Sequence, residues 1–598
     1  MCGILGVASP LAPLPTESEL SRWRERISQR GPDGSGAWSN ERVVLAHSRL
    51  TVRDPLGGAQ PVTSHNGRWV LVYNGELYND AELRTELHPA GGWRDHSDTE
   101  TVVAAIEAWG VEAFGRLRGM FALAAFDTHT NRLVLARDPL GLKPLYWWSD
   151  GASVVFGSEP RVVLAHPSVP ARPNLTCVSA YLTTLRTTLG AHSMFEGVHT
   201  LEPGTALSID LGREPLKPEK AHWHRGRPVD PTITLEAASD LLGAALADSV
   251  RRHLVSDVPV ALMLSGGLDS AVLASLAGEE APALHAYTSG ARGERGGDVE
   301  SSRLLAQQTG LSHHEVPLDE ESFKSGWKHM VTELGVPLST PNEVAIHALS
   351  RRLRADGHVV ALSGEGSDEL LGGYGGFLEA AAAHVAEAER GVAGSSGGRF
   401  QLDAASWVPV ATKAHLLRAE TWEALDADSE LLSEYDRTFD RCEEEVGGAG
   451  GALDAHLRFL RHVNLPRLLR RLDTATMLAS VEGRTPFADI ELVDLCESFP
   501  MDAKFHASGD SESARTKLAL RHAFEGRVPR RVIDRPKVSF ALPFHEWLDE
   551  HAETLSTSEF ANSVFDPQMV EAVAQDPAHS WRFAWPMINL ALWSERWF

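Results

Sequence analysis

A cysteine directly follows the initiator methionine in the opening segment MCGILGVASP. Such a cysteine is either incidental or a nucleophile. The other cysteines, Cys177, Cys442 and Cys496, are scattered and form no CxxC pair. This spacing argues against a disulfide framework or a structural zinc site. Cys2 therefore needs an explanation of its own.

A glycine-rich turn in the segment LMLSGGLDS lies where an apolar strand is expected to end and a helix to begin. Gly266 and Gly267 let backbone N–H groups approach an anion, and the hydroxyls of Ser265 and Ser270 add donors. The turn lacks the lysine of a GxxxxGK[ST] loop, whereas Asp269 offers an oxygen ligand for Mg²⁺. We predict a phosphate-binding loop. The plainer alternative is a glycine turn in which Asp269 caps the helix.

A second loop, SGEGSDELLGGY, follows the apolar strand expected at HVVAL and carries Glu365, Asp368 and Glu369. In open α/β sheets, ligands bind beyond the carboxyl ends of the strands. Two acidic loops at neighbouring strand ends therefore predict that Asp269 and Asp368 hold one Mg²⁺ against a nucleotide pyrophosphate. A capped turn explains one such loop well and two such loops poorly.

Two kinds of sequence pattern predict the strands and helices that must position these residues. The first 160 residues contain many short β-rich runs separated by turn residues, with single helical candidates between them, which indicates sheets packed with helices. From about residue 235, apolar strands alternate with helices, which is typical of a parallel sheet with crossover helices. Beyond residue 376 the sequence is mainly helical, with a loop expected at GVAGSSGGR and an amphipathic helix at RHVNLPRLLRRLD.

Composition narrows the possible partners. The 598 residues are 43% hydrophobic and 23% charged, with a net charge of −25, which disfavours nucleic acid and anionic membranes as partners. There is no apolar run of roughly 18 residues and no signal-peptide pattern, so we expect a cytoplasmic protein without a membrane span. The pairs His222/His224 and His313/His314 lack further ligands at useful spacing, and we expect them to be solvated or structural.

The chain resembles the glutamine-hydrolysing asparagine synthetases, a family that joins a class II glutamine amidotransferase to an ATP-pyrophosphatase synthetase. The resemblance covers nearly the whole chain. It rests on MCGILG, RGPDGSG, LAHSRLTV, GAQPV, YNGELYN, SDTE, RDPLGLKPLY, SGGLDS, SGEGSDELLGGY and EGRTPFAD, in the family's order. It implies an N-terminal Ntn-type αββα sandwich, followed by a parallel-sheet α/β domain with a helical C-terminal part. We place the glutaminase domain at 1–210, a linker at 211–234 and the synthetase domain at 235–598.

The resemblance explains Cys2. In this family the initiator methionine is removed, and the freed α-amino group of the cysteine acts as general base for its thiol. Asn74 and the N–H of Gly75 match the oxyanion hole, Arg49 matches the residue that binds the glutamine α-carboxylate, and Glu76 and Asp98 match the ligands of its α-ammonium group. A surface ion pair is the alternative for Arg49 and Asp98. The implied glutamine-binding residues are Arg49, Leu50, Val52, Asn74, Gly75, Glu76 and Asp98.

In the synthetase half, the resemblance implies that ATP and Mg²⁺ are cofactors and that the acceptor carboxylate becomes an acyl-adenylate. Lys517 matches a lysine that neutralises charge at the reacting phosphorus, with a solvated lysine on a helix face as the alternative. Glu365 matches a glutamate that takes a proton as ammonia attacks. Asp269 and Asp368 are the expected metal ligands. The implied ATP-binding residues are Leu264, Ser265, Gly266, Gly267, Asp269, Ser270, Ser289, Ser363 and Gly364.

The resemblance implies glutamine and a carboxylate as substrates, and aspartate is the first expectation for the carboxylate. Departures at GVPLSTPNEVAIHALSR and at Gly483 and Thr485 of EGRTPFAD keep other carboxylates open. A cyclase that needs no glutamine and an idle binding protein on the same scaffold are the further alternatives. The sequence leaves the oligomeric state open, with a homodimer as one option.

Overall fold

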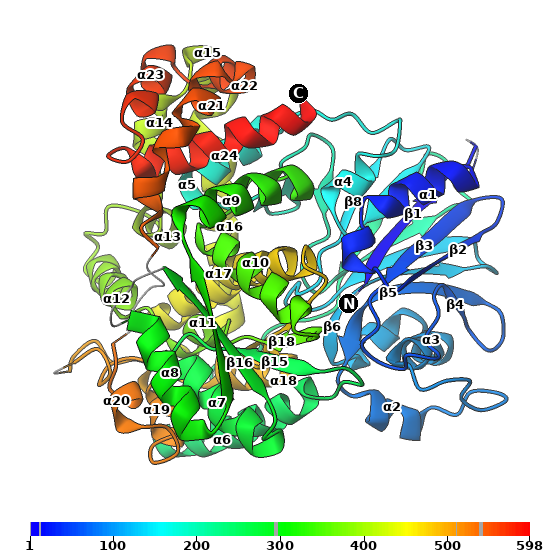
Figure 1. The fold of residues 1–598 in the computed structure, drawn as a ribbon, viewed down its shortest axis with the longest axis horizontal. Helices are drawn as coiled ribbons and strands as arrows, with labels where there is room; N and C mark the ends of the chain where they lie inside the picture. Colours follow the sequence, from blue (N-terminus) through cyan, green and yellow to red (C-terminus); the bar gives the residue numbers. More distant parts are fainter. Residues whose placement is uncertain (1, 11–12, 292–296, 510, 537–541) are drawn as a thin grey trace.

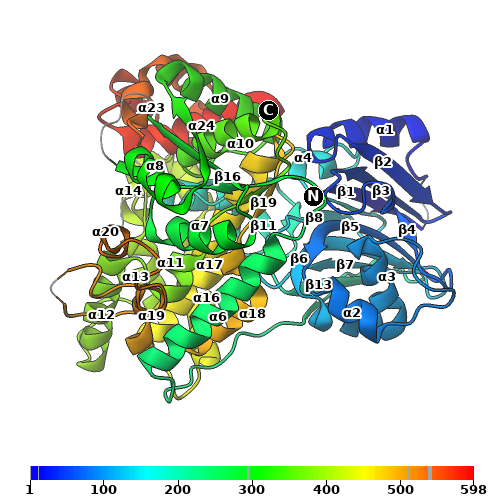
Figure 2. The same cartoon turned by 60° about the horizontal axis from the view of Figure 1, so that its bottom comes forward.

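The computed structural model describes residues 2–10, 13–291, 297–509, 511–536 and 542–598. Strands from the N-terminal third of the chain lie on one side of the molecule, and the helices of the C-terminal half lie on the other (Figures 1 and 2). No helix in the described ranges is both long enough and apolar enough to cross a bilayer.

Two antiparallel sheets form the N-terminal half. The first has the strand order β10 (Thr188–Leu189), β11 (His192–Ser193), β12 (His199–Thr200), β8 (Tyr146–Ser149), β9 (Val154–Gly157), β1 (Gly3–Ala8), β3 (Val43–Arg49) and β2 (Gly34–Ser39). The second has the order β14 (Glu219–His222), β13 (Thr205–Asp210), β7 (Arg132–Arg137), β6 (Gly119–Asp127), β5 (Trp69–Leu77) and β4 (Val62–Thr63).

The two sheets pack face to face, and alternate side chains of their strands point into the core between them. In β1, Ile4 packs in the core between the sheets, whereas Leu5 faces the other way and packs with Leu20 and Trp23 of α1 (Glu17–Glu25). Helix α3 (Asp98–Trp109) packs on the outer face of the second sheet, and α2 (Asp80–Glu86), α4 (Pro160–Val163) and α5 (Leu175–Thr184) complete the helices of this half. The expected αββα sandwich is confirmed.

A parallel sheet organises the second half, in the order β17 (Ser312–Leu318), β16 (His285–Ala291), β15 (Val260–Met263), β18 (Val360–Leu362) and β19 (Glu482–Arg484). Leu262 packs with one helical layer, and its neighbour Ala261 packs on the opposite face with α10. The helices around the sheet are α6 (Leu235–His253), α7 (Leu268–Glu280), α8 (Gly297–Thr309) and α10 (Asn342–Ala355). The predicted parallel sheet is therefore present.

The remaining helices form the C-terminal part. They are α9 (Glu320–Leu334), α11 (Ser367–Leu371), α12 (Gly375–Glu389), α13 (Gly397–Ala404), α14 (Val410–Leu416), α15 (Ala419–Ala424), α16 (Ser429–Val446), α17 (Ala452–Met477), α18 (Ile490–Ser498), α19 (Leu518–Ala523), α20 (Arg530–Ile533), α21 (Ala552–Thr557), α22 (Glu559–Val564), α23 (Pro567–Gln575) and α24 (Trp581–Trp597).

Three local expectations differ from the structure. The RHVNLPRLLRRLD segment is helical as expected, but α17 runs through the interior and is buried on most of its surface, so it has no exposed polar face of the amphipathic kind. Its arginines contact buried acids or line cavities and do not form an exposed face. The GVAGSSGGR loop ends early because the Ser396 side chain accepts the N–H of Arg399 and starts α13. Strand β14 lies inside the range expected as linker and pairs with β13.

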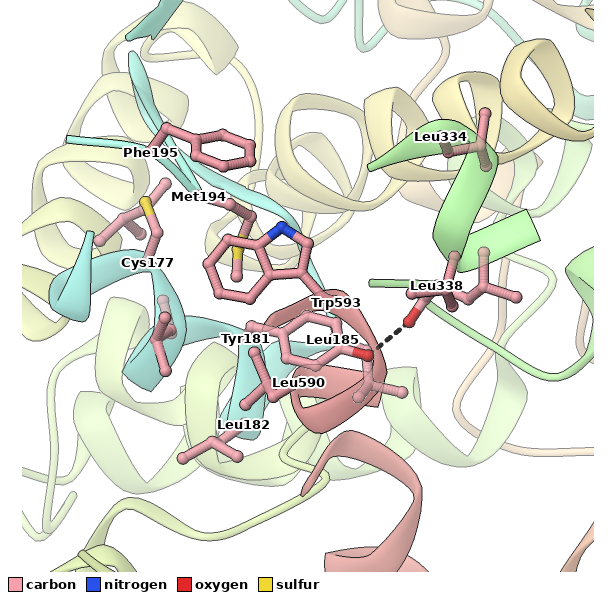
Figure 3. Packing of buried hydrophobic residues seen from close by; sticks show 14 of the residues in the cluster. Cys177, Tyr181, Leu182, Leu185, Met194, Phe195, Leu334, Leu338, Leu590 and Trp593 are labelled. Atoms are coloured by element: carbon pink, nitrogen blue, oxygen red, sulfur yellow. Dashed lines mark hydrogen bonds between the residues drawn. The ribbon is translucent and has the colours of Figure 1, made fainter. Parts of the chain in front are cut away.

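The two halves share a hydrophobic core. Figure 3 shows Trp593 of α24 among Cys177, Tyr181 and Leu182 of α5 and Phe195, which belong to the N-terminal half. The Tyr181 hydroxyl donates to the carbonyl of Leu338 at 2.5 Å. The C-terminal helix therefore fastens the sandwich to the synthetase half.

Candidate active sites

The start of β1 places Cys2 against Asn74 of β5. The Cys2 N–H donates to Asn74 Oδ1 at 3.0 Å, which leaves the other end of that amide as a donor. Asn74 Nδ2 is buried and has no hydrogen-bond partner among the described residues. A buried, unpaired donor is costly unless it has a ligand to meet. Burial raises the pKa of the Cys2 thiol, so the thiol needs a base beside it to react.

Gly75 is required by the packing of β5 on β6. A Cβ at this position would lie 2.3 Å from the carbonyl oxygen of Met120, closer than real side chains approach. The neighbouring predicted residues Leu50 and Val52 are buried in an apolar cluster that also contains Leu264 of the synthetase half. The expected glutamine site thus borders directly on the second half of the chain.

The predicted charged residues gather beside Cys2 and Asn74. Arg49 Nη2 donates to the carbonyls of Arg53 at 3.2 Å and Asp54 at 2.7 Å, so a loop fixes this guanidinium group. Asp98 Oδ2 accepts the N–H of Leu77 at 2.9 Å. Burial, with Asp98 among the nearby negative charges, raises the pKa of Glu76 to about 8. A bound ammonium group would favour the ionised form of this carboxyl.

Arg484 of β19, whose role the sequence did not reveal, joins this site to the second half. It is fully buried, with its Nη2 3.1 Å from Glu76 Oε2 and its Nε 2.6 Å from Glu482 Oε1. Its backbone carbonyl accepts the N–H of Ser363, a predicted ATP-binding residue, at 2.8 Å. One residue therefore contacts both predicted sites. EGRTPFAD was the only sequence signal for it.

Arg30 makes a second buried link. Its Nε donates to the carbonyl of Cys2 at 3.2 Å, and its guanidinium group lies 2.9 Å from Asp473 on α17 and 3.2 Å from Glu159. The two carboxylates raise the pKa of Arg30 despite its burial, so it stays charged. These contacts join residues hundreds of positions apart, and no local pattern could predict them.

A cavity of about 400 Å³ opens at the carboxyl ends of β15 and β18. The predicted residues that line it are Leu264, Ser265, Gly267, Asp269, Ser270, Ser289, Ser363, Gly364, Glu365, Asp368 and Lys517. Gly266 lies just outside this lining, with a φ of 71° and no room for a Cβ, which would lie 2.8 Å from the carbonyl of Asp298. The turn is thus a backbone cradle that only glycine can form.

Lys517 stands at the centre of this cavity's charges. Its Nζ lies 2.7 Å from each carboxylate oxygen of Asp269 and 2.6 Å from Asp368 Oδ1. Lys517 is buried at the start of α19, so the alternative of a solvated lysine is wrong. The two carboxylates raise its pKa against the effect of burial. The two glycine-rich loops therefore converge on one cation.

The same pair of carboxylates fits Mg²⁺, which takes one or two carboxylates together with phosphate oxygens. Among the described residues, no group of three or more histidine, cysteine, aspartate or glutamate side chains could hold a metal ion. A metal at this site would therefore need phosphate or water ligands in addition to Asp269 and Asp368.

Two arginines of α17 line the end of the cavity near Glu365. Arg471 Nη2 lies 2.6 Å from Glu365 Oε1, and this acid and Glu343 raise the pKa of Arg471 against the effect of burial. Arg467 lines the same cavity and donates to Asn464 Oδ1 at 2.9 Å. The sequence analysis missed both arginines because it interpreted this segment only as an amphipathic helix.

Known proteins show the same two-part organisation. The family model "Glutamine amidotransferase domain" matches residues 1–223, and the model "Asparagine synthase" matches residues 241–595. Asparagine synthetase [glutamine-hydrolyzing] 3 and 1 of Bacillus subtilis are each 28% identical, over 98% and 99% of this chain and 95% and 96% of their own. Amidase chry2 of Gibberella zeae is 27% identical over 88% of this chain and 85% of its own length.

The fold, the site and these matches define a glutamine-hydrolysing carbon–nitrogen ligase that uses ATP, with glutamine and a carboxylate as substrates. The chain belongs to the asparagine synthase family, whose model covers more than half of its length.

Proposed function

We propose that this enzyme hydrolyses glutamine at Cys2 and transfers the ammonia to an acyl-adenylate of aspartate, giving asparagine, AMP and pyrophosphate. The observation that carries the glutaminase half is the unpaired, buried Nδ2 of Asn74 beside Cys2. The arrangement of Lys517 between Asp269 and Asp368 supports the adenylating half.

In the glutaminase half, removal of Met1 leaves the α-amino group of Cys2 to accept the thiol proton. The thiolate attacks the glutamine amide carbon, and Asn74 Nδ2 and the Gly75 N–H stabilise the oxyanion that forms. The amide nitrogen leaves as ammonia, and water then hydrolyses the thioester to glutamate. Arg49 holds the α-carboxylate of glutamine, and Glu76 and Asp98 hold its α-ammonium group.

In the synthetase half, a carboxylate oxygen of the acceptor attacks the α-phosphorus of ATP, and pyrophosphate leaves. Lys517 stabilises the charge on the reacting phosphoryl group. Asp269 and Asp368 would hold Mg²⁺, which when bound neutralises phosphate charge. Ammonia then attacks the acyl carbon, Glu365 takes the proton, and AMP leaves. Arg471 Nη2 donates to Glu365 Oε1 at 2.6 Å and so positions this carboxylate.

The positive charges near Glu365 support aspartate as the acceptor. Arg467 and Arg471 line this end of the cavity and favour an acceptor that keeps a second negative group, as aspartate does. The departures at Gly483 and Thr485 leave another carboxylate as the second candidate. The two candidates differ only in the carboxylate that is adenylated and amidated.

The deciding experiment supplies amide-¹⁵N glutamine, ATP and Mg²⁺, with and without aspartate, and follows pyrophosphate and ¹⁵N-asparagine by mass spectrometry. Aspartate-dependent ¹⁵N-asparagine supports the proposal. Glutamate formation without pyrophosphate or asparagine would reject aspartate. The Cys2→Ala variant is the control, because it should use ammonium ions and not glutamine; unchanged glutamine-dependent product in this variant would reject the role of Cys2.

A further inference from the structure

A second large cavity lies apart from the Cys2 site and the phosphate-binding loops. Its volume is about 650 Å³, and it opens between α17, α16 and the chain that follows α5. Arg137, Arg186, Arg470 and Tyr435 are among its lining residues. It shares Arg467 with the nucleotide cavity, and the proposed mechanism uses none of its other lining residues.

Two of these arginines have only neutral partners. Arg186 donates to the Tyr435 hydroxyl, and Arg470 Nη1 donates to Thr188 Oγ1 at 2.9 Å. Within the described ranges, neither guanidinium group has a carboxylate at salt-bridge distance. Arg186 Nε is buried and also lacks a hydrogen-bond partner there. The cavity wall therefore carries positive charge that these partners do not neutralise.

Nearby acids do not neutralise this wall, since their charges are matched elsewhere. Glu202 pairs with Lys220, Glu434 lies 2.9 Å from Arg437, and Glu445 lies 3.5 Å from Arg458. A further lining acid, Glu444, is exposed to solvent.

Two further lining arginines, Arg137 and Arg467, add positive charge. Arg137 donates to the carbonyls of Lys143 at 2.7 Å and Leu201 at 2.6 Å, and among the described residues no carboxylate lies at salt-bridge distance from it either. Burial and the charges of Arg186 and Arg471 lower the pKa of Arg467 to about 10, which shows that these guanidinium groups repel one another. An anion in the cavity would relieve that repulsion.

This positive cluster is unusual in a chain with a net charge of −25. Guanidinium groups bind phosphate and carboxylate groups through paired N–H donors, and a cavity of this volume holds a molecule of metabolite size. We propose that the cavity binds a small molecule with at least two negative charges, carried by phosphate or carboxylate groups, and that this ligand is distinct from ATP, glutamine and the acceptor.

The first test titrates inorganic phosphate into the full-length enzyme by calorimetry in the presence of saturating ATP. One phosphate should bind per chain, and the double variant Arg186→Gln/Arg470→Gln should bind it at least about tenfold more weakly. Arg213→Gln, which removes an exposed arginine outside the cavity, is the matched control and should bind like the wild type. Equal binding by the double variant, or loss of all binding when ATP is added, would overturn the proposal.

A second measurement decides the matter if the double variant fails to fold. Crystals of the wild-type enzyme soaked in tungstate should show anomalous density between Arg186 and Arg470. Density at other places only would overturn the proposal. The variant Arg186→Lys/Arg470→Lys keeps both charges but loses the paired N–H donors, so its affinity for phosphate should lie between those of the wild type and of Arg186→Gln/Arg470→Gln.

Discussion

The glutamine site and the nucleotide cavity hold their charges in different ways. At the glutamine site, Glu76 is buried and depends on Arg484, which belongs to the other half of the chain. In the nucleotide cavity, Asp269, Asp368 and Lys517 all come from the synthetase half and face open space of about 400 Å³. The first site is built across an interface, whereas the second is built within one half.

This difference has a direct consequence for how the sites depend on each other. Damage to the nucleotide cavity should stay local, because the ion pairs of Lys517 with Asp269 and Asp368 lie within the synthetase half. Substitutions at the interface between the halves should impair the glutamine site directly. The predictions below test this asymmetry, from the largest expected effect to the smallest.

Lys517→Met should cause the largest and most local change. Loss of the ammonium group leaves the charge at the reacting phosphoryl group unbalanced, and pyrophosphate formation should fall by about 10²- to 10³-fold. Glutamine hydrolysis without ATP should change by less than about twofold, since distant sites act independently. Both rates can be measured on one preparation. Lys517→Arg keeps the charge as a control, and an equal fall in both activities would contradict local action.

Arg484→Met should damage both sites and the stability of the fold. It leaves Glu482 buried without its cation, which typically costs about 3–5 kcal/mol, and it removes the guanidinium group beside Glu76. Denaturant unfolding should report this loss, and the KM for glutamine should rise. Arg484→Lys should recover part of both. A free energy of unfolding within about 1 kcal/mol of the wild-type value would show that Arg484 does not stabilise the interface between the halves.

Glutamine binding should strengthen as the pH rises. Burial raises the pKa of Glu76 to about 8, so the empty site holds this carboxyl largely protonated at lower pH. In the proposed mechanism the ionised form binds the α-ammonium group of glutamine, and its population rises until the pH passes that pKa. The Kd for glutamine, measured on Cys2→Ala enzyme to prevent turnover, should therefore fall about tenfold or more from about pH 6 to about pH 8.

Glu76→Gln is the control for this pH effect. It removes the titrating group and keeps the shape of the side chain, so its weaker glutamine binding should lose most of the pH dependence. An identical pH profile in this variant would assign the titration to another group.

Arg118→Gln should have the smallest effect. Arg118 also bridges the two halves, 2.8 Å from Glu491, but both side chains are about 40% exposed. Exposed pairs contribute about 0.2–1 kcal/mol, far less than the buried bridge of Arg484. Denaturant unfolding should find a change within that range. A loss as large as that of Arg484→Met would show that burial does not separate the two bridges.

The residues that sequence could predict lie in short, contiguous motifs. Cys2, Asn74, Asp269, Asp368 and Lys517 each stand in a recognisable segment, and the structure brings them into two clusters. Sheets packed with helices and the parallel sheet were predictable because strand periodicity and the alternation of strands with helices are local patterns, whereas the two-sheet sandwich was implied by the family resemblance.

The rest depended on tertiary contacts. Arg484 and Arg471 gain their roles only from partners far along the chain, and a buried arginine has no local signature when its acid lies elsewhere. The arginines of α17 resembled a polar helix face for the same reason. Strand β14 was read as linker because its exposed, charged residues give no apolar alternation.

The packing of Trp593 and Phe195, whose ring centroids lie 5.4 Å apart, bears on how this chain can be engineered. Because the last helix packs into the sandwich, the halves are not interchangeable cassettes. A chimera that takes its sandwich from one relative and its synthetase half from another must carry matching α5 and α24 segments, or it will expose a tryptophan-rich surface and aggregate.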